Sequence, residues 1–548
     1  MNEARQGAGA GIPGEAGGKV FPARTFLAGA AGFLVSLFLL NLLLTDPTPE
    51  MPALAAPGPS MPAFQGLPRR RRPGEIRLFV VGASLTSGYP YQPPGAASYA
   101  TLLEKGLAAL FPGRPVTCRP AAIPALDSPR LVEIVREALR FSPSLVCVAL
   151  GSNEYANRIF FGRPLVPGGI RGKAEDWFSR ARLLFKAAWR LLPGGKVKAS
   201  REVQARIAGR ILRARPGRPG LGGLPVGRPD RRLLLGRLGA SMEEMSRACA
   251  RKGVPLVFLA AAHNLGGSWP WSDLGKAGRK EADRLVAAFR RGTGGGLLPL
   301  VESAFRKYPE RADLAFLEGL LLTRRGLERK AREAFERARD ADGVPMHLTG
   351  PVLEKIRETA RNLDRPFLDL NLPLARKKDG PIPDPGLFLD YGHLDLEGHR
   401  RLALFLARRL SALGLLPPLP AGWTGRFRAA VKAHLAAKIT PGSARGARPN
   451  LAWANGNFFM LFGNFRDALP LLERAFREGA TGSLEADFPF AFNLLFCAYT
   501  LAGKADLVRG MPGKEREARL RTVYGRMLRA AREGRLESLV ENMMGPGR

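Results

Sequence analysis

The sequence predicts an α/β protein in which helices cover a five-stranded parallel sheet. Short apolar runs alternate with amphipathic helical patterns through residues 76–413, and this alternation is typical of parallel sheets. The apolar runs contain β-branched and aromatic residues, which indicates strands buried on both faces. The expected strands are residues 76–81, 115–118, 145–150, 255–260 and 366–370, and the expected helices are residues 99–110, 129–140, 234–251, 352–362 and 396–413.

The composition indicates a multidomain protein without a nucleic-acid partner. The chain has 548 residues, of which 45% are hydrophobic, and its net charge is +36 from 84 Lys and Arg against 48 Asp and Glu. A nucleic-acid-binding protein gathers such charge in one patch. Here the basic residues are spread along the chain beside 64 Gly and 46 Pro, and no zinc-finger, RRM or KH signature is present. This bias is typical of a GC-rich genome.

The cysteines indicate neither a disulfide framework nor a zinc site. They lie far apart without metal-ligand spacing, and three of them lie in apolar runs, so we expect buried thiols. No cofactor and no metal are expected. The four positions are Cys118, Cys147, Cys249 and Cys497.

The N-terminal part of the chain has the composition of a membrane anchor. Residues 1–24 are rich in Gly and Ala and are expected to be disordered, whereas residues 25–44 carry no charge over 20 residues, enough for a helix to cross a bilayer. Basic residues precede this stretch and acidic residues follow it, so the positive-inside rule places the N-terminus in the cytoplasm and the remainder in the periplasm or outside the cell.

A cleaved signal peptide is the alternative, because Ala53-Leu54-Ala55 resembles a cleavage site. The apolar stretch is longer than the apolar core of a signal peptide, and the candidate cleavage site lies well beyond it. We therefore expect an uncleaved single-pass anchor, followed by a Pro-rich linker over residues 45–75 that acts as an extended spacer.

Two insertions are expected, because the five strands are spread over more chain than such a sheet needs. The first, residues 156–232, is strongly basic. Within it, residues 177–192 place aromatic residues and leucine on one side of a helix and Arg and Lys on the other. This pattern fits either a helix at a membrane interface or a helix packed on the neighbouring domain.

The second insertion, residues 285–342, and the C-terminal region, residues 414–548, share a spacing of small and large residues. This spacing is typical of tetratricopeptide (TPR) helix pairs, in which small residues let two antiparallel helices approach closely. A single repeat cannot bury its own apolar face, so each is expected to pack on neighbouring helices or on the core. Such helices are a candidate surface for a protein partner. The packing positions are Gly319, Ala331, Phe335 and Ala338 in the insertion and Gly456, Ala468, Leu472 and Ala475 in the C-terminal region.

Four polar residues occupy positions at which an open α/β sheet binds its ligands. Ser84 follows the first expected strand, Asn153 follows the third, and Asp390 and His393 stand three residues apart before the final helix. Ester hydrolysis requires a nucleophile, a base, a group that orients the base, and donors for the developing oxyanion. The four residues supply each part, although Asn153 taken alone would also suit the cap of a turn.

The segments that carry these residues resemble the sequence blocks of the SGNH or GDSL hydrolases. Gly82-Ala83-Ser84-Leu85 is similar to the family's Gly-Asp-Ser-Leu block, Gly151-Ser152-Asn153-Glu154 to its Gly-x-Asn-Asp block, and Asp390-Tyr391-Gly392-His393 to its Asp-x-x-His block. The resemblance extends over residues 76–413 and implies a three-layer, flavodoxin-like SGNH hydrolase fold. Residues 261–271 and the embedded helical repeat resemble a membrane-anchored, repeat-bearing bacterial branch of this family.

The resemblance also implies a role for each side chain. Ser84 would be the nucleophile and His393 the base, with Asp390 orienting the imidazole. The Ser84 backbone N–H and the Asn153 side-chain amide would form the oxyanion hole together with the backbone N–H of Ala125, which stands where the family has a glycine. The methyl group of Ala125 is expected to restrict the geometry of that donor. The positions that depart from the family's pattern are Ala83, Ala125 and Glu154.

The sequence gives less support for a catalytic role of the other polar residues near these blocks. Asp395 lies two residues after His393 and is the alternative to Asp390 as the orienting carboxylate. Structural roles are expected for His263 and for His399 in the first turn of the last helix. The sequence suggests no partner for two further histidines, His347 and His434.

Together these expectations describe a membrane-anchored serine esterase that faces the periplasm or the cell exterior. Its substrate would be a carboxylic ester, and O-acetyl groups of envelope or extracellular polysaccharide are candidates because the site would face outward. Two alternatives use the same features. One is a scaffold in which TPR-like helices on an inactive hydrolase fold recruit a protein partner, and the other is an O-acyltransferase that passes the acyl group to a sugar hydroxyl.

Overall fold

The chain divides into two units, Met1–Glu50 and Met51–Arg548, and the fold described here is that of the second. The expected membrane anchor at residues 25–44 and nearly all of the basic insertion lie outside the residues that the structure describes. No helix in the described part is both long and apolar enough to cross a bilayer. The computed structural model describes residues 61–124, 126–155, 228–270, 277–292, 296–346, 348–376, 380, 382–461, 465–479, 484–503 and 513–544.

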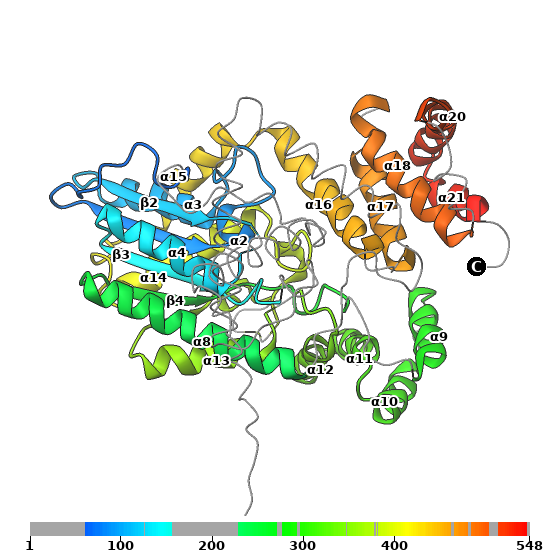
Figure 1. Ribbon diagram of the computed structural model, residues 1–548, viewed down its shortest axis with the longest axis horizontal. Coiled ribbons are helices and arrows are strands. Elements are labelled where there is room, and N and C mark those ends of the chain that lie inside the picture. The colour runs from blue at the N-terminus through cyan, green and yellow to red at the C-terminus, as the bar shows by residue number, and fades with distance from the viewer. Residues whose placement is uncertain are drawn as a thin grey trace, which may run out of the picture. The chain divides into compact units, whose positions relative to one another are not determined.

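Five parallel strands form the sheet, in the order β2-β1-β3-β4-β5 (Figure 1). This is the order of flavodoxin-like doubly wound sheets, which bind ligands beside the carboxyl ends of the strands where the strand order reverses. The prediction of an α/β fold with a five-stranded parallel sheet is confirmed. The strands are β1 (Ile76–Gly82), β2 (Val116–Ala122), β3 (Leu145–Leu150), β4 (Leu256–Ala260) and β5 (Phe367–Asp369).

Helices cover both faces of the sheet, and alternate strand residues contact opposite layers. Along β1, Phe79 and Val81 belong to the apolar core on one face, whereas Leu78 and Val80 belong to the core on the other. All are fully buried, and each stabilises the fold by about 1.5–3 kcal/mol. The first core contains α4 (Ser128–Ala138), α8 (Arg228–Arg251) and α13 (Gly350–Asn362), and the second contains α3 (Tyr99–Leu110), α14 (Leu396–Ala412) and α15 (Trp423–Lys438).

Strand β2 is longer than the sequence predicts, because it lies at the edge of the sheet. The prediction ended this strand at Cys118, whereas the observed strand continues through Arg119 and Pro120 to Ala122. Since β2 pairs with β1 alone, Pro120 can occupy a position where its missing N–H breaks no ladder bond, and Arg119 stays exposed to solvent.

The insertion between β4 and β5 forms a set of helices with an apolar core of its own. A Cβ atom at Gly319 would lie 2.5 Å from Phe335 Cδ1, so the glycine allows two helices to pack against each other at this point. Ala331 and Ala338 are buried beside Phe335. The predicted packing positions therefore meet, while assignment of the segment as a TPR stays a prediction. The helices are α9 (Arg279–Arg290), α10 (Leu297–Lys307), α11 (Ala312–Arg324) and α12 (Glu328–Ala341).

The C-terminal helices pack in the same manner and join the core on the α4 face of the sheet. A Cβ at Gly456 would lie 2.8 Å from Leu472 Cδ2, and Ala468 and Ala475 are fully buried. The helices are α16 (Pro441–Leu461), α17 (Phe465–Gly479), α18 (Leu484–Leu501), α20 (Gly513–Arg532) and α21 (Leu536–Met544). All four cysteines are free and buried, two of them in strands and two in helices.

Candidate active site

Ser84 lies where the chain turns from β1 into a short helix, α2 (Ser84–Ser87). Gly82 permits this turn, because a Cβ there would lie 2.2 Å from Thr86 Oγ1. The Thr86 hydroxyl is fully buried and is 2.8 Å from the hydroxyl of Tyr99, so it cannot move aside freely. As the first residue of the helix, Ser84 has a backbone N–H without an intrahelical acceptor. The serine thus combines, at one strand end, a hydroxyl and an amide donor that its own helix leaves without an acceptor.

His393 and Asp390 form a hydrogen-bonded pair in the loop before α14. The imidazole Nδ1 lies 2.8 Å from Asp390 Oδ2 and 3.0 Å from Oδ1. Oδ1 also accepts the backbone N–H groups of Gly392 at 2.9 Å and His393 at 2.8 Å. Burial alone would raise the pKa of Asp390, but the attraction of His393 and these hydrogen bonds outweigh burial and hold the pKa below its ordinary value. The ionised carboxylate therefore fixes the proton on Nδ1 and leaves Nε2 as the basic nitrogen.

Two tyrosine rings flank the imidazole at steep angles. The centre of the Tyr89 ring lies 5.3 Å from that of His393 at 63°, and the Tyr391 ring lies 5.6 Å away at 72°. Tyr391 comes from the loop between Asp390 and His393, whereas Tyr89 follows α2 and is 37% exposed. Edge-to-face contacts with the two tyrosine rings restrict rotation of the imidazole. The orientation of the base is thus held by packing as well as by Asp390.

A pocket brings the predicted catalytic residues together. Ser84, Asn153 and His393 all line it, and the apolar side chains of Leu85, Met346 and Leu348 form part of its wall. Ser84 is half-buried, and its hydroxyl forms no hydrogen bond with a residue in the described part of the chain. The pocket is lined by Ser84, Leu85, Ser152, Asn153, Ala262, His263, Met346, Leu348, Tyr391, Gly392 and His393.

Asn153 presents a buried donor to this pocket. It follows β3 in a turn that begins at Gly151, whose φ of +101° and whose contact with Leu348 both require glycine. The Asn153 side chain is 9% exposed, and its Nδ2 has no hydrogen-bond partner among the described residues. A buried donor without a partner is costly in a protein interior and is a feature of sites that wait for a ligand. Within the described part of the chain, Nδ2 is therefore free to donate to a ligand in this pocket.

Glu154 stands where the resembling family has aspartate, and it ties this turn to α4. Its Oε2 accepts Ser128 Oγ at 2.7 Å and the Ser128 backbone N–H at 3.3 Å, and its Oε1 accepts the Gly151 N–H at 3.4 Å. Burial raises the pKa of Glu154 to about 7; repulsion from Asp127 adds to the rise, and the hydrogen bonds oppose it. The departure from the family pattern is thus accommodated away from the pocket, by a longer side chain that reaches the start of α4.

The remaining sequence predictions have mixed outcomes. Ala125, the predicted backbone donor, lies outside the described residues, as does His347. Asp395 caps α14 by accepting the Gly398 N–H at 2.7 Å, so it occupies a structural position and Asp390 alone of the two carboxylates contacts His393 Nδ1. His399 is fully buried in the first turn of α14, as expected. His434 Nε2 lies 3.0 Å from the backbone oxygen of Ala96, a partner that the sequence did not suggest.

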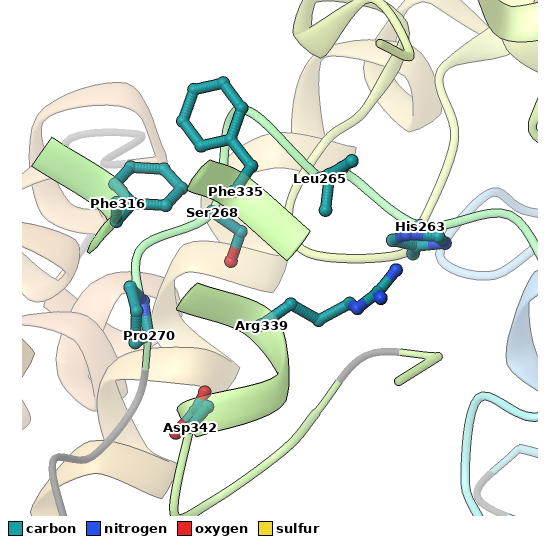
Figure 2. Close-up of a pocket in the computed structure, with 8 residues that line it drawn as sticks. All are labelled: His263, Leu265, Ser268, Pro270, Phe316, Phe335, Arg339 and Asp342. Atoms are coloured by element: carbon teal, nitrogen blue, oxygen red, sulfur yellow. The ribbon is translucent and has the colours of Figure 1, made fainter. Parts of the chain in front are cut away.

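His263, for which a structural role was expected, lines the same pocket as Ser84 and His393. It also lines a second, small cavity between the loop after β4 and the helices of the insertion (Figure 2). Figure 2 shows Arg339 reaching from α12 toward His263, and the Arg339 guanidinium is held by Asp340 at 2.8 and 3.2 Å. The helical insertion therefore packs against the loop that forms one wall of the pocket lined by Ser84 and His393.

Sequence reasoning missed two asparagines that hold the Asp390 loop. Asn264, in the loop four residues after the end of β4, donates from Nδ2 to the Asp390 backbone oxygen at 2.9 Å and from its backbone N–H to Tyr391 O at 2.9 Å. Its place beyond a strand end is a signal that would have found it. Asn455 on α16 donates from Nδ2 to Asp390 Oδ2 at 3.2 Å, and no local pattern marks it.

Comparisons with known proteins find distant structural neighbours only. No family model matches the sequence, and no curated protein matches it. A GDSL-like lipase from Bacteroides thetaiotaomicron is 10% identical, with a TM-score of 0.27, over 62% of this chain and 89% of that chain. A protein from Desulfitobacterium hafniense assigned to the G-D-S-L family of lipolytic proteins is 9% identical, with a TM-score of 0.27, over 61% and 98%.

A protein from Bacteroides fragilis assigned as an acylhydrolase is 9% identical, with a TM-score of 0.28, over 64% of this chain and 93% of that chain. TM-scores of this size carry no argument about activity. The case for a function therefore rests on the strand order, on the His393–Asp390 pair, and on the pocket that this pair shares with Ser84 and Asn153.

Proposed function

We propose that the protein is a serine hydrolase of the SGNH type that cleaves carboxylic esters. One observation carries the proposal: a histidine whose Nδ1 is bound to an ionised aspartate shares a pocket with a serine at a strand end and with a buried amide donor that has no partner among the described residues. These are the nucleophile, the base, the orienting group and an oxyanion donor that acyl transfer requires.

In the first half of the reaction, His393 Nε2 takes the proton from Ser84 Oγ as this oxygen attacks the ester carbonyl carbon. The carbonyl oxygen becomes an oxyanion, which accepts hydrogen bonds from Asn153 Nδ2 and the Ser84 backbone N–H, with Ala125 N–H as the further donor that the sequence predicts. Asp390 stabilises the imidazolium through Nδ1. The tetrahedral intermediate then expels the alkoxide, which takes the proton from Nε2, and the acyl group stays on Ser84.

In the second half, His393 Nε2 takes a proton from water, and the resulting hydroxide attacks the acyl carbon. The same donors hold the second oxyanion. Its collapse breaks the bond to Ser84 Oγ, which regains the proton from Nε2, and the carboxylic acid leaves. An acceptor sugar hydroxyl in place of water would make the enzyme an O-acyltransferase, so product analysis with an added acceptor separates the two outcomes.

A short acyl group suits this pocket best. Leu85, Met346 and Leu348 line it and are each at least nine-tenths buried, which provides an apolar wall of limited extent for the acyl chain. Acetyl esters on envelope or extracellular polysaccharide are the substrates we propose. They accord with the proposed single-pass anchor at residues 25–44 and with a catalytic domain in the periplasm or outside the cell. The TPR-like helices are the proposed contact for a protein partner.

The test is the hydrolysis of p-nitrophenyl acetate by the purified full chain in detergent. Ser84→Ala is expected to lower kcat/KM by at least about a thousandfold, because the covalent route is lost. Ser411→Ala is the matched control: this serine lies near the far end of α14, where its hydroxyl donates to Pro417 O at 3.0 Å. Equal rates for wild type and Ser84→Ala would overturn the proposal.

A further inference from the structure

The C-terminal helices contribute a side chain to the carboxylate of the active site. Asn455 on α16 is 65 residues from Asp390 along the chain, and its side chain is buried. Its Nδ2 lies 3.2 Å from Asp390 Oδ2, and the same oxygen lies 2.8 Å from His393 Nδ1. One carboxylate oxygen is thus shared between the proposed base and a residue of the C-terminal region.

Asn455 donates to this carboxylate from a different segment of the chain than the other donors do. The backbone N–H groups of Gly392 and His393 and the His393 imidazole all belong to the loop that carries Asp390. Asn264 holds the Asp390 backbone but does not bind the carboxylate. Within the described part of the chain, Asn455 is the one side chain from outside this loop that donates to the carboxylate. Loop-internal bonds move with the loop, whereas the bond from Asn455 fixes the carboxylate relative to another helix.

The place of Asn455 depends on how α16 packs. The next residue, Gly456, contacts Leu472 on α17 so closely that a Cβ would lie 2.8 Å from Leu472 Cδ2. Asn457, one residue further, accepts a hydrogen bond from Asn493 Nδ2 on α18 at 2.7 Å. Asn455 therefore lies in the same turn of α16 that two neighbouring helices hold. A shift of α16 along or around its axis would carry the donor away from Asp390.

We propose that Asn455 is a positioning residue of the active site, through which helix α16 fixes the carboxylate that orients the base His393. This inference rests on the hydrolase function proposed above. A donor on Oδ2 fixes the plane of the carboxylate and draws negative charge from the oxygen that faces Nδ1. The carboxylate then orients the imidazole without over-stabilising its protonated form.

Asn455→Ala removes this donor, and the carboxylate keeps its hydrogen bonds to the His393 imidazole and to the backbone N–H groups of its own loop. We expect kcat to fall about tenfold with KM within about twofold of wild type, because Asn455 does not line the pocket. The acid limb of the kcat/KM profile is expected to move up by about half a pH unit, since a carboxylate with one donor fewer stabilises the imidazolium more. Asn455→Asp, which adds a second carboxylate at the same place, is expected to move the limb further in the same direction.

Asn457→Ala is the matched control. Asn455 and Asn457 lie on the same helix and are 7% and 8% exposed, and each makes a side-chain hydrogen bond to a residue on another segment. Loss of the Asn457 bond lowers stability but leaves the close contact of Gly456 with Leu472, which still holds this turn of α16 and keeps the Asn455 donor at Asp390. A purely structural role for Asn455 would make the two variants alike, with less folded protein but an unchanged pH profile per active site.

A second readout does not need activity. The Nδ1 proton between His393 and Asp390 is expected to give a low-field NMR resonance that is absent in His393→Ala. The pH midpoint of that resonance should move in Asn455→Ala and not in Asn457→Ala. The proposal is overturned if both variants keep the wild-type midpoint, or if both move alike. Absence of Ser84-dependent hydrolysis in wild type would instead overturn the hydrolase function, and the midpoint would still decide the role of Asn455.

Discussion

The buried carboxyl of Glu154 makes the turn that carries Asn153 sensitive to pH. The perturbation is Glu154→Gln, which keeps the size of the side chain and removes its titration. Burial raises the pKa of Glu154 from 4.5 in the unfolded chain to about 7 in the folded protein. Below pH 4.5 both states are protonated and the stability is fully present. As the pH rises from 4.5 to 7 the folded state holds a proton that the unfolded state has lost, so stability falls and stays lower above pH 7.

The rise in pKa corresponds to a loss of about 3 kcal/mol in the stability of the folded state, and most of this loss occurs between pH 5 and 8. This loss is equivalent to an increase of about a hundredfold in the opening equilibrium of the turn. Glu154→Gln should remove this dependence and make the turn more stable than wild type at pH 8. In the variant the single amide oxygen can keep the Ser128 hydroxyl and N–H as its donors, whereas the Gly151 N–H, 3.4 Å from Oε1 in the wild-type protein, loses its acceptor.

Hydrogen exchange followed by mass spectrometry measures how the stability of this turn depends on pH, on a peptide that covers residues 145–155. After correction for the intrinsic exchange rate, wild-type protection should fall from pH 5 to pH 8, and Glu154→Gln protection should stay nearly constant. Glu133→Gln, an exposed neighbour on α4, is the control and should behave as wild type. Equal slopes for wild type and Glu154→Gln would refute the reasoning.

Two further predictions concern the oxyanion donor and the helical insertion. Asn153→Ala should lower kcat by about a hundredfold to a thousandfold with little change in KM, as measured by ester hydrolysis, because the lost donor acts on the charge that develops in the transition state; an unchanged kcat would remove Asn153 from the oxyanion hole. Gly319→Ala should destabilise the insertion by about 1–3 kcal/mol, because its Cβ would lie 2.5 Å from Phe335 Cδ1. Its Tm in thermal unfolding should fall below that of Gly425→Ala, a helical glycine with no atom within 4 Å of an added Cβ, and equal Tm values would contradict the packing.

The fold and much of the site were predictable because local patterns encode them. Each central strand is a short apolar run, and a run buried on both faces leaves little choice but a parallel sheet with helices on each side. Ser84 and Asn153 follow such runs directly, in turns that begin with glycine. Gly82 and Gly151 show why glycine is required there, since Thr86 Oγ1 and Leu348 Cδ1 fill the space that a side chain would need.

The contacts between distant segments were not predictable from local pattern. Asn455 meets Asp390 only when α16 packs beside the loop, and nothing in its neighbourhood marks an active-site residue. Glu154 departs from the family's pattern, and the sequence alone does not show where its longer side chain lies. The structure shows a compensating contact with Ser128, which the longer side chain reaches across the start of α4. His263 likewise lines the pocket because of the path that the loop after β4 takes, which no local pattern predicts.

Covalent labelling of Ser84 tests the central claim most directly. A fluorophosphonate reacts with a serine oxygen only where a base removes the proton and donors hold the phosphoryl oxygen, so it requires no knowledge of the natural substrate. Mass spectrometry of the labelled full chain should find one phosphonyl group on the peptide that contains Ser84. Labelling should be absent in Ser84→Ala and strongly slowed in His393→Ala. Folded wild-type protein that leaves Ser84 unlabelled, or that labels at the same rate without His393, would contradict the account.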